Sequence, residues 1–391
     1  MRIETIMKAK LVLLSLILVA GGCHEPKSKS QQQGNEITAI PATPTPTQTI
    51  TITPSVLSLA RSGMAAITVG SKTLFAGGYV SKNTGADRYS NVVDIYDAST
   101  NTWSQATLPK ALGKVIATSV GSKAIFASGG IYPDDSDAVD IYDESTNTWS
   151  QATLSKARSA IRATSVGSKA IFAGGLYTQK TLSVSSSNFS NVVDIYDAST
   201  NTWSQATISQ GRHSAAAATV GTKAIFAGGA IGSTSSNVVD IYDLATNSWS
   251  KTTMPKARTY TAVTVVGPKA LFAGAGLEFS DDVDIYDMTS NTWSKTTLPK
   301  AIGSIPCYLK AVTIGSKAIF AGKDEYAAEV EIYDVATQKW FTATLPKSRQ
   351  GFAMISIGAS VLFAGGYTTR TNPSSDMDRV DIYDLPSNTW K

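Results

Sequence analysis

The side chains best suited to chemistry in this sequence are arginines that recur at corresponding places, each shortly before a run of small residues. They are Arg61, Arg158, Arg212, Arg258 and Arg349, and His213 directly follows Arg212. A guanidinium group matches a carboxylate through its planar fork of donors. Cationic groups that converge on a concave site also concentrate anions there. These six residues are therefore candidates for binding an anionic ligand, and a structural role for the arginines is the alternative.

The other residues include few His and Cys side chains that could serve in catalysis or bind a metal. The chain has two histidines, His24 and His213, and two cysteines, Cys23 and Cys307. A Ser-His-Asp arrangement needs a positioned base, and two distant cysteines cannot build a Cys-based metal site. We therefore expect no catalytic residue, no metal and no cofactor.

The elements that must position these residues come from an internal repeat. An acidic-Ile-Tyr-Asp tetrapeptide occurs seven times, and a Trp follows each copy at a constant distance. The tetrapeptides begin at Asp94, Asp140, Asp194, Asp240, Asp284, Glu331 and Asp381, and the tryptophans are Trp103, Trp149, Trp203, Trp249, Trp293, Trp340 and Trp390. Successive copies are roughly 45–55 residues apart, a period typical of propellers and solenoids.

One copy, residues 159–207, contains four short extended runs. They cover residues 160–166, 170–173 and 192–196, and a fourth run starts near Trp203. A two-residue Gly-Ser link between the first two runs favours a hairpin, and the Val/Ile/Tyr composition of the third favours a strand. Helical spacing of apolar residues is absent. The sequence therefore predicts an all-β, seven-bladed β-propeller with four antiparallel strands per blade.

The residue types also predict where each strand lies. The first run of the fourth copy is nearly all Ala, which suits the crowded axis, so the Trp run is expected outermost with its ring over the neighbouring blade. The Asp that ends each tetrapeptide is expected to bond its own backbone in a turn. These seven carboxylates, which we interpret as structural, are Asp97, Asp143, Asp197, Asp243, Asp287, Asp334 and Asp384.

The repeat resembles the kelch family. Three features carry the resemblance: a double Gly after the second run, a Tyr on the third run, and a Trp about seven residues after that Tyr. The pairs are Gly77-Gly78, Gly129-Gly130, Gly174-Gly175, Gly228-Gly229 and Gly365-Gly366, whereas the fifth and sixth copies have Gly274-Ala275-Gly276 and Gly322-Lys323, where distortion is expected. The resemblance implies the propeller fold over roughly residues 55–391. It leaves function open, because one fold hosts both enzymes and binding modules.

The resemblance also implies two alternatives for chemistry. Kelch blades commonly carry an Arg at the position of the five arginines, where it can bind backbone carbonyls. A branch that epimerises N-acetylneuraminate implies a periplasmic acidic-sugar isomerase, for which Glu278 or Glu325 could face the pocket. A branch of copper oxidases uses several His, Tyr and Cys ligands, which one histidine in the propeller cannot supply.

The first residues have the composition of a bacterial lipoprotein signal. Lys8 and Lys10 precede an apolar run that ends at Ala20, and Gly21-Gly22-Cys23 follows. The run is too short to span a bilayer. We expect a signal peptide over 1–22 with lipidation of Cys23, a Pro/Thr/Ser/Gln-rich linker over 23–50 and the propeller over 51–391. A plain secretory signal is the alternative, and a start at Met7 rather than Met1 would give a more typical signal.

These features together predict a lipid-anchored binding module of the bacterial cell envelope, in the outer membrane if the host is Gram-negative, because His24 rather than Asp follows Cys23. A protein or glycan is the expected partner of a monomeric propeller. Without the signal the chain is nearly neutral, which gives no support for nucleic-acid binding.

Two further expectations concern the ends and the loops. Residues near 50–57 are predicted to complete blade seven and close the ring, with Ile52 at the position of a Trp. The longest loops, 79–91, 176–191 and 367–379, are predicted to bind the partner. Their candidate contacts are Arg88, Tyr89, Tyr177, Lys180, Phe189 and Arg370.

Overall fold

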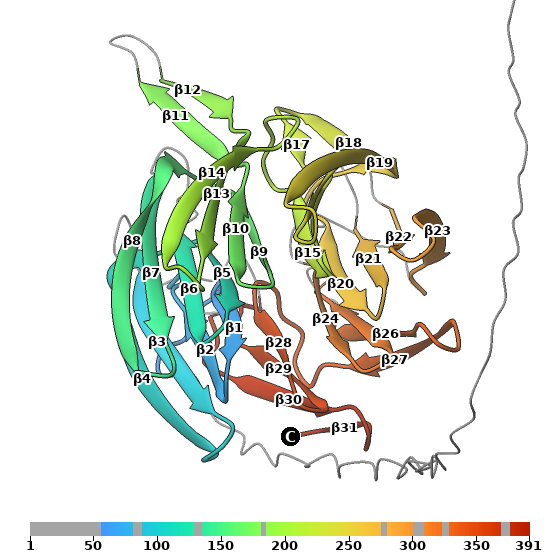
Figure 1. The fold of residues 1–391 in the computed structure, drawn as a ribbon. Coiled ribbons are helices and arrows are strands. Elements are labelled where there is room, and N and C mark those ends of the chain that lie inside the picture. Colours follow the sequence, from blue (N-terminus) through green and yellow to red (C-terminus); the bar gives the residue numbers. More distant parts are fainter. Residues whose placement is uncertain are drawn as a thin grey trace, which may run out of the picture. The chain divides into compact units, whose positions relative to one another are not determined.

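The computed structural model describes residues 56–80, 88–128, 135–180, 185–274, 280–299, 309–322, 328–368 and 376–391, within the compact unit Gln48–Lys391. The elements of these residues are β-strands, arranged as seven antiparallel sheets around a central axis (Figure 1). Each sheet contains four main strands, so the predicted seven-bladed propeller is confirmed. The predicted signal peptide, Cys23 and the linker lie outside the described residues, among which no helix has the length and apolarity to cross a membrane.

Blades one to three follow the chain in order. Blade one contains β1 (Ala65–Val69), β2 (Lys72–Ala76), β3 (Ser90–Asp97) and β4 (Thr102–Leu112). Blade two contains β5 (Val115–Val120), β6 (Lys123–Ser128), β7 (Ser136–Asp143) and β8 (Thr148–Arg158). Blade three contains β9 (Arg162–Val166), β10 (Lys169–Ala173), β13 (Val192–Asp197) and β14 (Thr202–Thr207), with an extra hairpin, β11 (Leu176–Lys180) and β12 (Ser185–Phe189).

Blades four to seven repeat the arrangement. Blade four contains β15 (Ala216–Val220), β16 (Lys223–Ala227), β17 (Ala230–Ile231), β18 (Thr234–Asp243) and β19 (Ser248–Arg258). Blade five contains β20 (Ala262–Val266), β21 (Lys269–Ala273), β22 (Asp282–Asp287) and β23 (Thr292–Thr297). Blade six contains β24 (Lys310–Ile314), β25 (Lys317–Ala321), β26 (Glu329–Asp334) and β27 (Lys339–Thr344), and blade seven contains β28 (Ala353–Ile357), β29 (Ser360–Ala364), β30 (Val380–Asp384) and β31 (Thr389–Trp390).

The first strand of every blade lies next to the axis. β1, β5, β9, β15, β20, β24 and β28 contact one another in this order, and β28 contacts β1, which closes the ring. Small side chains permit this approach, as in β15, whose sequence is AAATV. Each first strand turns into the second through a two-residue link whose Gly has a positive φ, such as 55° at Gly167. Primed hairpin turns require a positive φ at this position.

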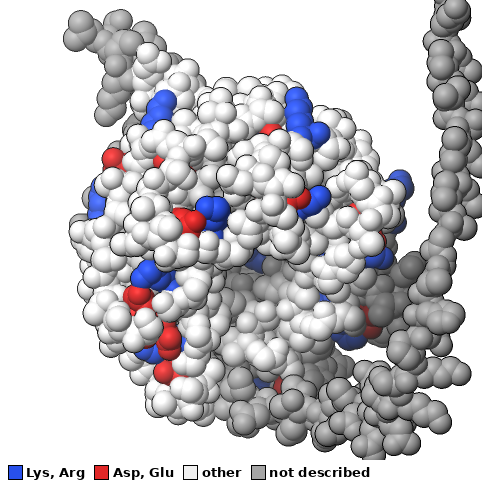
Figure 2. All heavy atoms as spheres, viewed as in Figure 1, with Lys and Arg blue, Asp and Glu red and all other residues white. Residues whose placement is uncertain are grey.

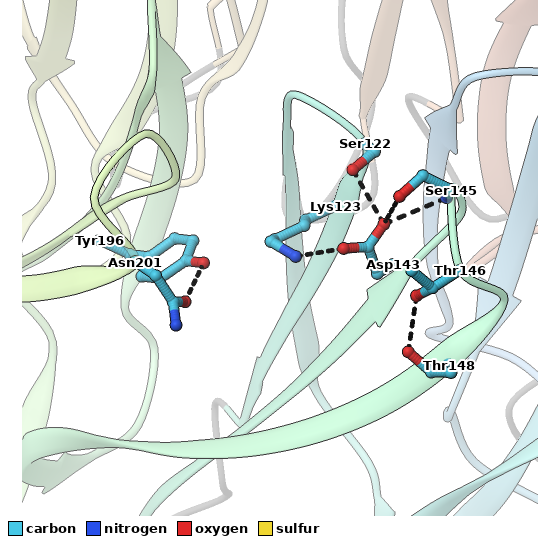
Figure 3. Close-up of polar contacts among 8 residues, drawn as sticks. All are labelled: Ser122, Lys123, Asp143, Ser145, Thr146, Thr148, Tyr196 and Asn201. Atoms are coloured by element: carbon cyan, nitrogen blue, oxygen red, sulfur yellow. Dashed lines mark hydrogen bonds and ion pairs between the residues drawn. The ribbon is translucent and has the colours of Figure 1, made fainter.

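The turn before each outer strand is built by the Asp that ends the tetrapeptide. In blade two, Asp143 Oδ1 accepts a hydrogen bond of 3.1 Å from the Ser145 amide, and its carboxylate also binds Ser122 and Lys123 (Figure 3). The equivalent Asp accepts a backbone amide two or three residues on in all seven blades. The predicted structural role of these carboxylates is therefore confirmed.

The Trp strand is outermost, and its ring joins neighbouring blades. Trp149 of β8 packs at the margin of a buried cluster that contains Leu74 of blade one and Phe126 and Tyr142 of blade two. Its ring centroid lies 5.9 Å from that of Phe126 and 5.2 Å from that of Tyr142. The predicted position of the Trp strand and its cover over the adjoining blade are both confirmed.

The N-terminal end of the described chain completes blade seven. Val56 pairs antiparallel with Arg379, and the Leu57 amide donates a 2.6 Å hydrogen bond to the Asp378 carbonyl. Leu57 is buried in a cluster that joins blades one and seven. The predicted closure by residues near 50–57 is therefore confirmed for residues 56 and 57. Ile52 lies outside the described residues, and Trp390 of β31 pairs with Tyr383 in the usual place of the blade's Trp.

Candidate ligand-binding site in the central cavity

The five predicted arginines are buried and do not face the channel. Their side chains are 0–1 % exposed, and each is paired with the acid that begins the tetrapeptide of the blade it enters. Nitrogen–oxygen distances are 2.8 Å for Arg61–Asp94, 2.7 Å for Arg212–Asp240 and 2.6 Å for Arg258–Asp284, and the remaining pairs are Arg158–Asp194 and Arg349–Asp381. This geometry supports the structural role, which was the alternative to ligand binding.

Arg61, Arg212 and Arg258 each join two blades in the described part of the chain, as Arg212 shows. Its guanidinium donates 2.6 Å and 2.9 Å hydrogen bonds to the carbonyls of Gly228 and Phe226 in blade four. Its own carbonyl accepts a 2.9 Å bond from the Gly175 amide in blade three. A Cβ on Gly174 would lie 2.5 Å from the same carbonyl, so the double Gly is required by this close approach. Burial lowers the pKa of Arg212, and Asp240 opposes the shift.

The connections that carry the arginines meet around one mouth of the channel. The residues that follow each Arg line a cavity of about 620 Å³ at the axis, where Figure 2 shows the ring hollowed at its centre. All seven blades contribute to this cavity. Its lining includes Ser62, Lys114, Arg162, Ser214, Tyr260, Lys310 and Gly351.

The rim of this cavity is held by backbone hydrogen bonds between equivalent positions of successive blades. The Tyr260 amide donates to the Ser214 carbonyl at 3.3 Å, and the Ser214 amide donates to the Ala160 carbonyl at 3.2 Å. Gly63 and Gly351 are linked in the same way across the seam. Every one of these residues has a positive φ, 55° at Tyr260 and 52° at Ala160. A positive φ strains a residue with a Cβ, so the rim geometry is maintained against a local cost.

Cations line the cavity where the repeat predicts small residues. Arg162 and Lys310 each begin an inner strand, at the position held by Ala65, Ala216, Ala262 or Ala353 in other blades. Lys114 stands at the position of Gly63 and Gly351. Lys114 and Lys310 are exposed to the cavity, and Arg162 is partly buried, with one bond of 2.9 Å to the Ile161 carbonyl. The described lining residues include no Asp or Glu.

His213 stands beside the same rim, between two aromatic rings. Its ring stacks on Phe189 at 5.9 Å and meets the edge of Tyr260 at 6.4 Å. Its Nδ1 lies 3.0 Å from Ser214 Oγ. Burial lowers the pKa of His213, and the charges of Arg162 and Lys114 lower it further. None of the six predicted site residues lines the cavity itself, but His213 contacts Tyr260, which does.

The long loops are only partly within the described residues. β11 and β12 form a hairpin that projects from the ring (Figure 1). Tyr177 of this hairpin lies under Lys156 Nζ, 2.9 Å from its ring centroid, and the Thr178 amide binds the Asp135 carboxylate. Tyr79 and Tyr367 of the other two loops line the cavity. Arg370 lies outside the described residues, as do Glu278 and Glu325, the acids suggested for an isomerase.

The fold and the cavity define a seven-bladed propeller whose blades are joined by Arg–Asp pairs and double glycines, with a ligand-sized opening on its axis. The chain belongs to the kelch-repeat family. Residues 116–322 match the KLHDC2/KLHL20/DRC7 Kelch-repeats domain, and residues 60–107 match the Kelch motif. No curated protein matches the chain. The family supports a binding and scaffolding module as the general function.

The three cavity cations were not among the predicted site residues. The sequence nevertheless contains their signal, because each interrupts a position that is small in most other copies. The recurrence of Arg in the connections predicted a ligand site there, whereas residues that recur in every blade of a propeller are those that packing requires. The candidate site is therefore marked by departures from the repeat.

Proposed function

We propose that this protein is a lipid-anchored binding module of the bacterial cell envelope, which receives an acidic group of a protein partner in its central cavity. The observation that carries this proposal is the set of three cations, Lys114, Arg162 and Lys310, on a cavity of about 620 Å³. A cavity of this size accommodates a side chain or a chain end.

Electrostatics favour an anionic group in this cavity. The cations come from blades two, three and six, and no acidic side chain stands among the described lining residues. Like charges that converge in a concave, partly desolvated site raise the local concentration of anions. Because Lys114 and Lys310 are exposed, added salt should weaken binding, with screening over about 8–10 Å.

A macromolecular partner is supported by the surroundings of the cavity. The kelch propeller supports a binding role in general, and the β11–β12 hairpin extends beyond the ring on the side of blade three (Figure 1). Anchoring at the envelope rests on the sequence: Cys23 ends a lipoprotein-type signal and a polar linker follows. A protein presented on such a linker could bind its partner at some distance from the membrane.

The acidic-sugar isomerase is the less supported function. Proton transfer next to a carbonyl requires an acid and a base within hydrogen-bond reach of the substrate. The described lining residues provide lysines and tyrosines but no carboxylate. The cations would bind an acidic sugar as well as an acidic peptide, so the experiment below includes both.

The experiment measures binding of pentaglutamate and of oligomeric sialic acid to the purified chain by calorimetry and thermal shift at low salt. A K114Q/R162Q variant is compared with a K251Q/K295Q control, whose lysines are exposed on the outer strands. Pentaglutamate should raise the melting temperature of the parent and the control but not of K114Q/R162Q. A bound ligand at a hundredfold excess over Kd stabilises the fold by about 2.7 kcal/mol.

Two results would contradict the proposal. Equal binding by K114Q/R162Q and the parent would exclude the cavity, and absence of binding to either anion would exclude an acidic group as the ligand. If only the sialic acid oligomer binds, the partner is a glycan, and isomerisation of the bound sugar should then be assayed. Membrane anchoring is tested separately through Cys23.

A further inference from the structure

A titratable residue, His213, lies beside the cavity and is not one of the three cations of the proposed site. His213 occupies the position after the blade's arginine, where other blades have Ser62, Ser159, Thr259 or Gln350, all buried. His213 itself is only partly buried. The residue that follows it, Ser214, lines the cavity, and so does Tyr260, whose ring it contacts.

The ring of His213 packs between two aromatic rings. Phe189, the last residue of β12, stacks on it with an interplanar angle of 18°, and Tyr260 meets it edge-on at 68°. The backbone of His213 pairs with Ala230 of β17. With Nδ1 at 3.0 Å from Ser214 Oγ, the ring is positioned by a hairpin of blade three and by blades four and five.

The charged and titratable groups that face His213 in the described structure are Arg162 of β9, Lys114 before β5 and Tyr260 after β19. Both charges are positive, and both belong to the cavity lining. A proton on His213 would add a third positive charge to this group. The charges of Arg162 and Lys114 therefore disfavour protonation of His213. An anion bound to the cations would remove that opposition.

We propose that His213 takes up a proton when the cavity binds its anionic ligand, so that ligand and proton are captured together. This inference rests on the proposed function, since it requires an anion at Lys114 and Arg162. Thermodynamic linkage makes the effect reciprocal: if the anion favours the proton, the proton favours the anion.

The sign of the pH dependence follows from this linkage. In the free protein the pKa of His213 lies below the ordinary value for histidine. A bound anion moves it upward, so affinity should increase as the pH falls through the range in which His213 titrates, and it should level off below the free-state pKa. The increase should be about tenfold for each unit by which the ligand raises the pKa.

The test uses inorganic sulfate, whose charge is constant between pH 5 and 8, where histidine is the side chain that ordinarily titrates. Calorimetric titrations across this range, in two buffers of different ionisation enthalpy, give the affinity and the number of protons taken up. The matched variant is His213→Phe, which keeps a ring against Phe189 but cannot take up a proton. Cavity binding is confirmed in parallel by its loss in K114Q/R162Q.

The parent should bind sulfate more tightly at pH 5.5 than at pH 8 with proton uptake, and His213→Phe should bind with little pH dependence. Sulfate binding that is independent of pH in the parent would overturn the inference and leave the proposed function intact. The same pH dependence in His213→Phe would also overturn it. If the parent binds no sulfate at either pH, while pentaglutamate also fails, the inference and the proposed function are both wrong.

Discussion

Blade two contains a buried carboxylate at the position where five other blades have an Arg–Asp pair. In blade three, Asp194 receives Arg158 and a 3.0 Å hydrogen bond from the Ser155 amide. In blade two the equivalents of those donors are Leu112 and Pro109, neither of which can donate from that position. Asp140 is 2 % exposed and accepts a 3.2 Å bond from Gln151 Nε2. Burial raises the pKa of Asp140, and the bond from Gln151 opposes the shift.

The same substitution should therefore have opposite effects in the two blades. A carboxyl whose pKa is raised by folding binds its proton more tightly in the folded state, so its charge costs stability at a pH above that folded value. Asp140→Asn removes this cost and should stabilise the protein at pH 7 by on the order of 1 kcal/mol. Asp194→Asn leaves Arg158 as a buried charge without its counter-ion, and breaking such a pair costs about 3–5 kcal/mol.

The assay is urea-induced unfolding of the parent and both variants, supported by melting curves, in which roughly 2 °C corresponds to 1 kcal/mol for a large domain. The gain of Asp140→Asn should shrink as the pH falls below the folded pKa toward about 4, the ordinary value for Asp, because Asp140 is then protonated. Destabilisation by Asp140→Asn at pH 7, or a gain that persists unchanged at pH 4, would refute the reasoning.

Two other predictions concern the ends of the chain. Leu57→Ala should destabilise the fold by about 2–5 kcal/mol in urea unfolding, because Leu57 is 2 % exposed in the cluster that closes the ring. The control is Val56→Ala, at a residue that is 61 % exposed, and it should change the free energy of unfolding by less than about 0.5 kcal/mol. A loss of less than about 0.5 kcal/mol in Leu57→Ala would show that the seam contributes little. Cys23→Ser should release the protein from the membrane fraction or stop its processing, since several acyl chains on one Cys bind a membrane firmly; normal processing with retention in membranes would show that Cys23 is not the anchor.

The fold could be predicted because equivalent positions in the blades pack in the same way and therefore have the same residue types. The turn that reads Asp-Ala-Ser-Thr-Asn at residues 97–101, the double Gly and the Trp strand each recur, and the local chemistry of each can be recognised in one copy. Asp97 accepts a hydrogen bond from the backbone amide of Ser99, two residues further on. Gly174 is required by the close approach of one carbonyl, that of Arg212. The seam was also predictable, because residues before Arg61 align with the end of an ordinary blade.

The candidate site was harder to predict because the spacing of residues along the sequence does not show in which direction their side chains point. Arg61 and its equivalents are placed at the mouth by the repeat, but whether a side chain turns toward the channel or into the blade depends on which acceptors lie behind it. Asp94 lies on a strand far along the sequence and receives Arg61 at 2.8 Å. Arg162, four residues after Arg158, lines the cavity instead.

The seam described above is chemically equivalent to the other joints that carry an arginine. Arg61 donates to Phe75 O and Asp94 in blade one, and its carbonyl accepts a 3.0 Å bond from the Gly366 amide in blade seven, as Arg212 does between blades four and three. Lys391 pairs with Ile382 and Val56 with Arg379, so both described ends lie along one strand, β30 and the residues just before it. A circular permutant, in which the chain is joined at this seam and opened at another joint that carries an arginine, would therefore have the same contacts between blades.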